Sequence, residues 1–351
     1  MKSLVYRFFK GYVKIGLFFF NNKTRVIGLE NIPKKGAILY TINHPNGLID
    51  SLNIVTKTPR KCHFLVKADV FKKPIIVKFF SLLNMNPIYR IRDGLNTISK
   101  NQEIFERCHK ILHNQEALMI FPEGSHNVRR TVRVLKKGFT RILFGTFDKY
   151  PDLQIHVVPI GITYQNPGSY PSKVCFMIGK PILANKYYNS DELNMSIKQL
   201  KEVVYEQLKE LCVHIPDDEN YANNLKKLEN AQVDFTDVAA VNAIIKNGNY
   251  PQRKKASKNY LKILFYLIGL NSPISFIIWK MASKNIENIE FVDTFKFGLN
   301  VISFPLLYSI QSSIIAHFFG WKVAGIYFIS SLLLLLLYTK TAPTPPKSHL
   351  E

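Results

Sequence analysis

Cysteine is scarce in this 351-residue sequence, and its four copies are widely spaced. They are Cys62, Cys108, Cys175 and Cys212, with no CxxC pair and no neighbouring histidine cluster. Structural zinc sites use closely spaced ligands of these types, so the sequence gives no indication of a metal site. The thiols are interpreted as reduced, structural residues of a cytosolic protein.

Acidic residues are also few. The chain has 25 of them against 47 lysines and arginines, which gives a formal net charge of +22. This balance favours anionic partners such as nucleic acid, phospholipid headgroups or phosphorylated metabolites. No nucleic-acid recognition motif is present, and nucleic-acid binding would not explain the apolar C-terminal third. We therefore expect a lipid or phosphorylated partner and no nucleic acid.

The N-terminal segment 1–23 lacks the small-residue cleavage site of a signal peptide, and basic residues interrupt its apolar run. At helical spacing one face carries Leu4, Phe8, Tyr12 and Ile15. This pattern predicts an amphipathic helix that lies in a membrane interface. An ordinary helix packed on the core is the alternative.

Short β-branched runs alternate with helical stretches over residues 24–213. The runs predicted as strands are 25–30, 36–43, 63–67, 86–91, 117–122, 155–164 and 174–180, and helices are predicted over 48–56, 70–83, 94–113 and 135–147. Strands that are apolar on both faces and separated by helices indicate an α/β domain. We expect a mixed, largely parallel sheet of about seven strands, with functional residues in loops at the strand ends.

A charged region follows the predicted sheet. Helices are predicted over 191–213 and 222–246, and the latter lies within a charged helical linker, 214–259, that ends in a basic run. Positive charge beside apolar segments marks the cytoplasmic side of a membrane. We therefore expect an integral membrane protein with a cytoplasmic α/β domain, in the inner membrane if the source is bacterial.

The apolar segments lie in 260–340. Segments 297–320 and 323–338 are predicted to span the bilayer, because the first is long enough and apolar enough to cross it and the second, though short, is apolar enough. Segment 260–279 is predicted either to span the membrane or to enter and leave it on the same side, because Asn271, Ser272 and Pro273 interrupt it. The side of the C-terminus stays open. A buried helical hairpin of a soluble domain is the alternative.

The stretch "TINHPNGLID" ends a predicted strand and places His44 six positions before Asp50. On a continuous helix the two would point about 240° apart, and on a strand they would lie about 20 Å apart. A hydrogen bond between them needs the "PNG" segment to form a turn. Asp50 would then accept the Nδ1 proton of His44 and leave Nε2 as a base. A purely structural pair is the alternative.

A second stretch, "MIFPEGSHNVRR", leads from a strand into Glu123, Gly124 and Ser125, followed by clustered arginines. Glycine lets a substrate approach the backbone closely, and guanidinium binds phosphate in a bidentate manner. A strand followed by a solvated basic turn is the alternative. A third stretch, "NPIYRIRDG", places Arg90 and Arg92 at another strand end, where one of them could bind phosphate.

These stretches resemble a known family. "NHPNGLID", "NPIYRIRD", "FPEGSHNVRRTVRVLKKG" and "VVPIGITY" are similar, in order and rough spacing, to the four motif blocks of the glycerolipid acyltransferases, the lysophosphatidate and glycerol phosphate acyltransferase superfamily. The resemblance covers residues 24–182. It implies an O-acyltransferase of phospholipid synthesis, which moves an acyl group from acyl-CoA or acyl carrier protein to glycerol 3-phosphate or 1-acylglycerol 3-phosphate, with no metal or other cofactor.

The resemblance also implies roles for individual residues. His44 is similar to the general base and Asp50 to the acid that orients it. Arg90 resembles the ligand of the acceptor phosphate, Glu123, Gly124 and Ser125 the acceptor-binding turn, and Pro159 the proline of the fourth block. Arg129 and Lys137 are additional substrate-binding candidates on physical grounds, because they bring positive charge to the same region.

One departure concerns the first block. Five residues separate His44 from Asp50, where the commonest version has four. A minority branch that includes fungal glycerol phosphate and dihydroxyacetone phosphate acyltransferases resembles this chain in its "HPN" and its longer spacing. The choice of acceptor therefore stays open. The rival interpretation is a noncatalytic membrane protein that binds anionic lipid through the same basic cleft.

Overall fold

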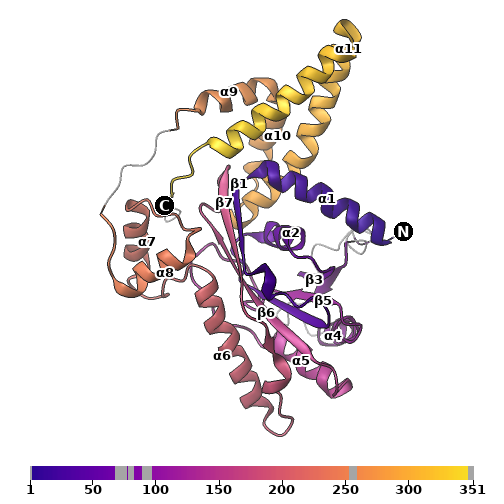
Figure 1. Cartoon of the computed structure of the whole chain (residues 1–351), viewed down its shortest axis with the longest axis vertical. Coiled ribbons are helices and arrows are strands. Elements are labelled where there is room, and N and C mark those ends of the chain that lie inside the picture. The colour runs from indigo at the N-terminus through magenta and orange to yellow at the C-terminus, as the bar shows by residue number, and fades with distance from the viewer. Residues whose placement is uncertain (1, 68–76, 78–82, 89–96, 253–258, 347–351) are drawn as a thin grey trace.

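The computed structural model describes residues 2–67, 77, 83–88, 97–252 and 259–346. Its centre is an eight-stranded sheet in the order β1-β7-β6-β2-β5-β3-β4, with β8 paired to β6 (Figure 1). The strands are β1 (Asn21–Ile27), β2 (Ala37–Ile42), β3 (Cys62–Lys67), β4 (Met85–Ile88), β5 (Ala117–Ile120), β6 (Ile155–Tyr164), β7 (Ser172–Ile178) and β8 (Ile182–Leu183). The predicted mixed, largely parallel sheet is confirmed, since among the described strands only β6 forms antiparallel pairs, with β7 and β8.

The described helices include those that cover both faces of the sheet and those of the C-terminal third, which projects from it. They are α1 (Lys2–Phe20), α2 (Gly47–Lys57), α4 (Thr97–His113), α5 (Gly138–Lys149), α6 (Leu193–Leu211), α7 (Tyr221–Asn230), α8 (Val238–Asn247), α9 (Lys262–Asn271), α10 (Pro273–Ser283) and α11 (Val292–Thr341), with short 3-10 turns η1 (Leu29–Asn31), η4 (Ala184–Tyr187) and η5 (Ile289–Phe291). The helix predicted over 70–83 lies almost wholly outside the described residues.

The alternation of side chains along β2 divides the core into two layers. Leu39 packs with α4, α5 and α6 on one face, whereas Ile38 and Tyr40 pack with α1, α2 and the start of α11 on the other. All three side chains are fully buried. Burying a side chain of this size stabilises a fold by about 1.5–3 kcal/mol, so both faces of β2 hold it at the centre of the domain.

The segment expected to be a charged helical linker is packed against the sheet. Tyr221, Leu228 and Phe235 form a buried cluster that also contains Cys175 of β7. The single helix predicted over 222–246 is wrong, because the chain breaks between α7 and α8. Asp237 caps α8 by accepting a hydrogen bond from the Ala240 amide, and burial of Phe235 favours this break.

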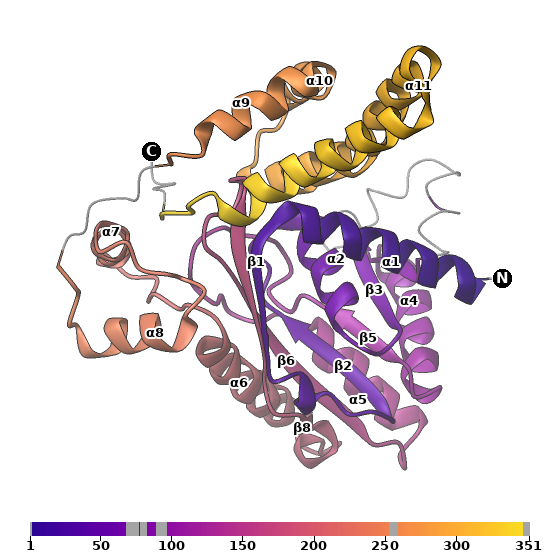
Figure 2. The ribbon, with the colours of Figure 1, turned by 45° about the horizontal axis from the view of Figure 1, so that its top comes forward.

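Helix α1 has two apolar faces. Tyr6, Leu17 and Phe20 are buried in the core, whereas the face predicted for a membrane interface, which includes Phe8 and Ile15, is exposed. The exposed fractions of Phe8 and Ile15 are 67% and 62%. The same helix therefore packs on the domain with one face (Figure 2) and carries an exposed apolar stripe on the other.

The C-terminal third projects from the α/β domain. Helices α9 and α10 are bent by 98° at Ser272, the break predicted from the sequence. Helix α11 folds back on itself at Gly320, whose backbone is not helical, so residues 292–319 and 321–341 form two adjacent arms (Figure 1). Arm residues Tyr308 and Leu335 share one buried cluster.

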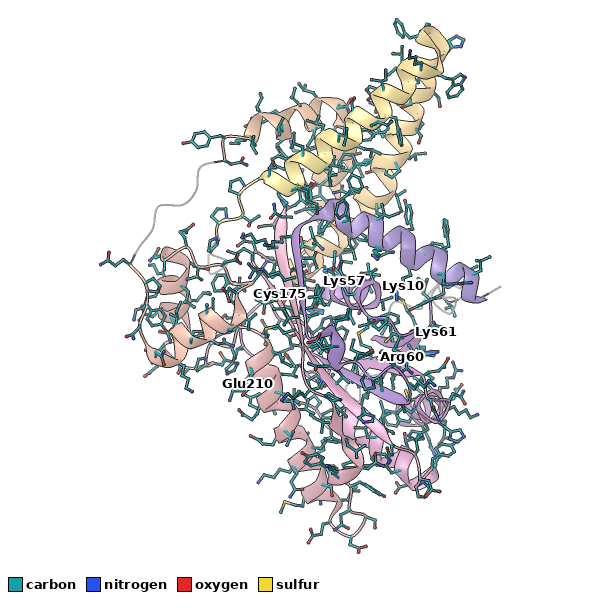
Figure 3. All side chains as sticks on the ribbon, in the orientation of Figure 1. Lys10, Lys57, Arg60, Lys61, Cys175 and Glu210 are labelled. Atoms are coloured by element: carbon teal, nitrogen blue, oxygen red, sulfur yellow. The ribbon has the colours of Figure 1, made fainter. Side chains whose placement is uncertain are left out.

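Within the part of the chain that the structure describes, one helix is long and apolar enough to cross a membrane, the region Ile289–Thr341. The bent pair α9 and α10 passes the same test when its two halves are taken together. The side chains at the far end of α11, including Phe318, Phe319 and Trp321, are exposed (Figure 3). This apolar surface is consistent with the predicted membrane association, although the number of crossings stays a prediction.

Candidate functional site

The turn after β2 brings the predicted histidine and aspartate together. Residues 44–46 reverse the chain, and α2 then begins at Gly47, so Asp50 lies in its first turn. His44 Nδ1 lies 2.8 Å from Asp50 Oδ2. The imidazole nitrogen therefore donates to the carboxylate, and Nε2 is the ring nitrogen that can accept a proton.

Asp50 is fully buried and receives two further hydrogen bonds. The Asn46 amide donates to the same Oδ2 at 2.8 Å, and the Tyr164 hydroxyl donates to Oδ1 at 2.8 Å. Burial, together with the Asp50 carboxylate, raises the pKa of Tyr164 well above its ordinary value, so Tyr164 is a neutral donor. Donors on both oxygens stabilise the ionised form of a buried carboxylate.

Tyr164 was not identified from the sequence as a site residue, although it ends the fourth motif. The register of β2 against β6 accounts for its position. Asn43 exchanges two hydrogen bonds with Ile162 of β6, at 2.6 and 3.0 Å. This link fixes the end of β2 against the end of β6 and so places Tyr164 beside the turn that carries His44.

The His44 ring is held between other side chains. It stacks on Phe121 at a centroid distance of 3.7 Å, and the ring of His126 meets it edge-on at 5.7 Å. The exposed fraction of the His44 side chain is 14%. A ring with this little freedom presents Nε2 in a fixed direction, as a base requires.

Glu123, Gly124 and Ser125 form a turn after β5. The buried Glu123 carboxylate accepts from Arg133 Nε at 2.7 Å, and Arg133 also donates to the hydroxyl and carbonyl of Ser125. Burial raises the pKa of Glu123, and the Arg133 guanidinium opposes that shift. Arg133, which was not among the predicted site residues, therefore holds this turn in shape.

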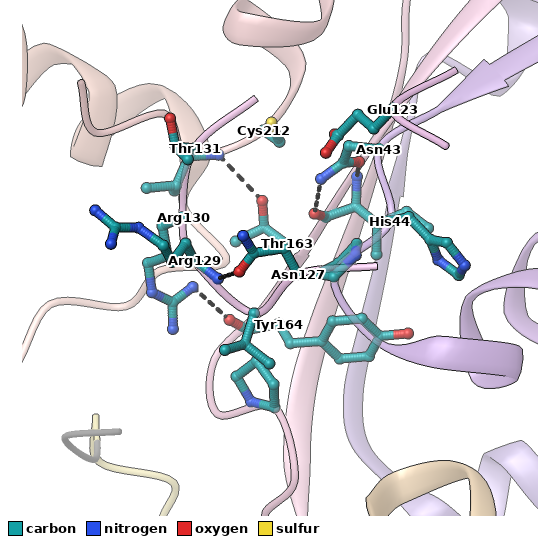
Figure 4. Close-up of a pocket in the computed structure, with 15 residues that line it drawn as sticks. Asn43, His44, Glu123, Asn127, Arg129, Arg130, Thr131, Thr163, Tyr164 and Cys212 are labelled. Carbon is teal, nitrogen blue, oxygen red and sulfur yellow. Dashed lines mark hydrogen bonds between the residues drawn. The ribbon is translucent and has the colours of Figure 1, made fainter. Parts of the chain in front are cut away.

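The arginines that follow have different surroundings (Figure 4). Arg130 is half-buried, donates to the carbonyls of Tyr164 and Gln165, and lies over the Phe235 ring. Burial lowers its pKa to about 10. Arg129 is exposed and pairs with Asp217 at 2.5 Å. Only Arg129 of these two can readily exchange its partner for a substrate, because an exposed ion pair is worth at most about 1 kcal/mol.

A cavity of about 20 Å³ lies between the backbone of His44 and these arginines. Figure 4 shows that the His44 ring points away from Arg129 and Arg130. A volume of this size fits about one water molecule. A ligand larger than water would therefore have to reach the His44 ring from outside this cavity.

Two other predicted site residues, Lys137 and Pro159, lie elsewhere, and a third is not described. Lys137 is exposed at the start of α5, and Pro159 is buried inside β6 opposite Thr41. Arg90, like Arg92, lies outside the described residues. Pro159 is thus part of the sheet beside the strand that leads to His44, whereas the Lys137 side chain is exposed.

A segment far along the chain completes the site. Asp293, in the first turn of α11, accepts from Asn46 Nδ2 at 2.6 Å and from the Gly168 amide at 2.8 Å. Nothing in the sequence motifs indicated this residue. The available signal was its place at the start of a long apolar segment, because an acid that becomes buried there needs hydrogen-bond partners.

Among residues 2–67, 77, 83–88, 97–252 and 259–346, no group of three or more His, Cys, Asp or Glu side chains is placed to hold a metal ion. Among these residues, the groups best placed to act on a substrate are the His44–Asp50 pair and the turn at Glu123.

Comparison with known proteins shows similarity over the same region. The family model described as Acyltransferase matches residues 23–163. The chain is 29% identical over 119 residues to glycerol-3-phosphate O-acyltransferase 1 of Saccharomyces cerevisiae, covering 32% of this chain and 16% of that protein. It is 28% identical over 134 residues to 1-acyl-sn-glycerol-3-phosphate acyltransferase of Borreliella burgdorferi, covering 38% of this chain and 51% of that protein.

A solved structure is also similar. It is the 1-acyl-sn-glycerophosphate acyltransferase of Thermotoga maritima, with a TM-score of 0.40 and 19% identity over 59% of this chain and 82% of that one. The similarity to the sequence relatives spans about half of the bacterial protein and less than a fifth of the yeast protein.

Proposed function

Because the α/β domain belongs to the glycerolipid acyltransferase superfamily, we propose that this chain is a membrane-bound O-acyltransferase. It transfers a fatty acyl group from a thioester, acyl-CoA or acyl carrier protein, to a hydroxyl of glycerol 3-phosphate or 1-acylglycerol 3-phosphate. The observation that carries the proposal is the 2.8 Å contact between His44 Nδ1 and the buried Asp50 carboxylate.

The reaction needs a base and a positioned thioester. His44 Nε2 takes the proton of the acceptor hydroxyl as its oxygen attacks the thioester carbonyl. The new C–O bond gives a tetrahedral intermediate, which collapses by breaking the C–S bond. The leaving thiolate then takes the proton from the imidazolium. Asp50 stabilises that imidazolium without accepting its proton.

The acceptor phosphate calls for cations near His44. Arg90 is the first candidate by resemblance, but it lies outside the described residues. Arg129 and Lys137 are the candidates that the structure describes. Arg129 is exposed and on the segment that leaves the Glu123 turn, so a phosphate could replace Asp217 as its partner. The turn of Glu123, Gly124 and Ser125 would then line the acceptor, with Arg133 keeping its shape.

Membrane binding is supported by apolar surface beside positive charge. The exposed face of α1 and the far end of α11 are apolar. Lys10 donates to the Thr58 carbonyl, and Figure 3 places it near Lys57 and Lys61. Cations beside an apolar face suit anionic headgroups. Carbonate-resistant retention in membranes, with the α/β domain accessible to protease from the cytoplasmic side, would support integral insertion.

The activity test uses the full chain in lipid nanodiscs. Labelled acyl-CoA and acyl carrier protein are each offered with glycerol 3-phosphate, dihydroxyacetone phosphate and 1-acylglycerol 3-phosphate. We expect turnover with at least one pair, and loss of that turnover in His44→Ala. His113→Ala, at an exposed position on α4, is the matched control and should keep full activity.

Three results would count against all or part of the proposal. Binding of anionic lipid without turnover by any pair would favour the noncatalytic membrane protein. Full activity of His44→Ala would remove the base assignment and leave the transferase intact. Salt-sensitive DNA binding without acyl transfer would favour the nucleic-acid alternative instead.

A further inference from the structure

The start of the C-terminal helical region packs directly on the turn that carries His44. Gly47 has a φ of 46°, and a Cβ there would lie 2.7 Å from the Glu290 carbonyl oxygen. Only glycine permits this backbone conformation and this close approach together. The segment 289–296 can lie against the HPNG turn because Gly47 has no side chain.

Two hydrogen bonds join this segment to the turn. Asn46 Nδ2 donates to Asp293 Oδ2 at 2.6 Å, and the Ile49 amide donates to Thr294 Oγ1 at 3.3 Å. The second bond satisfies one of the free amides at the N-terminus of α2. Asn46 is fully buried and Asp293 is 2% exposed, so water competes little for this contact.

The same carboxylate also holds a second loop. The Gly168 amide, in the loop between β6 and β7, donates to Asp293 Oδ2 at 2.8 Å, and Lys296 donates to the Gly168 carbonyl at 3.2 Å. Asp293 thus ties the turn after β2 to the loop after β6. These are the strands that supply His44 and Tyr164.

The path from Asp293 to the base is short. The side chain of Asn46 binds Asp293, and its backbone amide donates to Asp50 Oδ2, the oxygen that also receives His44 Nδ1. We propose that Asp293 is a positioning residue for the His44–Asp50 pair, so that the C-terminal helical region is part of the catalytic apparatus as well as an anchor. This inference rests on the proposed acyltransferase function.

The test compares variants of the full chain in nanodiscs. Asp293→Ala should lower kcat by about 10-fold or more, the scale of losing hydrogen bonds to a buried charge, with little change in KM because Asp293 does not touch substrate. Asp293→Asn keeps an acceptor oxygen and should recover part of the loss. Glu287→Ala, an exposed acid in the segment before α11, is the matched control and should behave as the wild type.

A second readout separates positioning from a general structural role. With isotope-labelled histidine, the NMR titration of His44, assigned with His44→Ala, should move to lower pH in Asp293→Ala, because a less well held Asp50 stabilises the imidazolium less. Glu287→Ala should leave the titration unchanged.

The outcomes are distinct. Wild-type kcat and an unchanged His44 titration in Asp293→Ala would overturn the inference. A kcat loss with an unchanged titration, or one that Asp293→Asn does not reduce at all, would also count against it. Should the wild type lack transferase activity, the proposed function fails, and the His44 titration still decides whether Asp293 positions the pair.

Discussion

The Tyr164 hydroxyl lies 2.8 Å from Asp50 Oδ1, on the carboxylate oxygen that His44 does not use. The two residues are 114 positions apart in the chain and are both buried. The helix that begins in the His44 motif block and the strand of the fourth block therefore meet in one hydrogen-bonded group.

Tyr164→Phe should weaken that group without changing its shape. The variant leaves Asp50 Oδ1 without its donor, and the loss of a hydrogen bond to a buried charge costs about 1.5–3 kcal/mol. We expect kcat to fall by about 10-fold and the thermal transition to move down. Tyr12→Phe, on the exposed face of α1, is the comparison for the loss of a hydroxyl; an equal loss of kcat in both variants would contradict the assignment.

Arg133→Met should be more destabilising than the double variant Glu123→Gln with Arg133→Met. The single change leaves the buried Glu123 carboxylate without its 2.7 Å partner, and breaking a buried pair in this way costs about 3–5 kcal/mol. Removing the charge as well should restore part of the stability. Thermal unfolding of Glu123→Gln, Arg133→Met and the double variant gives the coupling free energy between the two side chains.

If the losses of stability in the two single variants add up to the loss in the double variant, Glu123 and Arg133 act independently. Activity is informative too, because the pair shapes the predicted acceptor turn. We expect KM for the acceptor to rise in Arg133→Met more than KM for the thioester.

Gly16→Ala and Gly11→Ala form a matched pair on α1. A Cβ at Gly16 would lie 2.7 Å from Val301 Cγ2 of α11, whereas one at Gly11 meets nothing within 4 Å. Alanine stabilises an exposed helix by about 1 kcal/mol over glycine. Gly11→Ala should therefore raise the melting temperature slightly and Gly16→Ala should lower it. Equal shifts of the same sign would contradict the close packing of α1 on α11.

His109→Leu should reduce the sensitivity of the fold to acid. Burial lowers the pKa of His109; the nearby Glu106 and Asp148 oppose this shift and Lys149 adds to it. Below about pH 6.5 the unfolded chain binds a proton that the folded chain does not, so stability falls as the pH falls. The melting temperature of the wild type should drop between pH 7.5 and 5.5 more than that of His109→Leu.

His113→Leu, at an exposed position, is the control and should keep the wild-type slope. Some slope remains in His109→Leu, because burial also lowers the pKa values of His63 and His214. An unchanged slope in His109→Leu would show that His109 is protonated in the fold.

Local patterns in the sequence predicted much of this molecule. Strands that are apolar on both faces gave the sheet, and the "PNG" turn gave the approach of His44 to Asp50, since both depend on residues close in sequence. Asn46 and Asp293 are 247 positions apart, and their contact depends on how the C-terminal region docks, which periodicity does not encode. The break between α7 and α8 was missed for a related reason, because Phe235 is buried by distant contacts.

The roles of Arg129, Lys137 and Pro159 illustrate the same limit. A motif fixes the order of residues, but exposure decides whether a cation meets solvent or a protein carbonyl. Arg129 and Arg130 are adjacent in sequence, yet Arg129 is exposed and pairs with Asp217, whereas Arg130 is half-buried and donates to two backbone carbonyls. Neither secondary-structure propensity nor the charge pattern of the sequence distinguishes these two arginines.

The two arms that meet at Gly320 begin and end on the α/β domain. The first arm starts at Asp293 beside the His44 turn, and the second ends at Lys340, which donates to the carbonyls of Phe18 and Asn21 at the junction of α1 and β1. A tether with one attachment lets a domain swivel, whereas two separate attachments remove that freedom. An α11 hairpin inserted in a bilayer would therefore set the tilt of the sheet and the height of the His44 ring above the lipid surface.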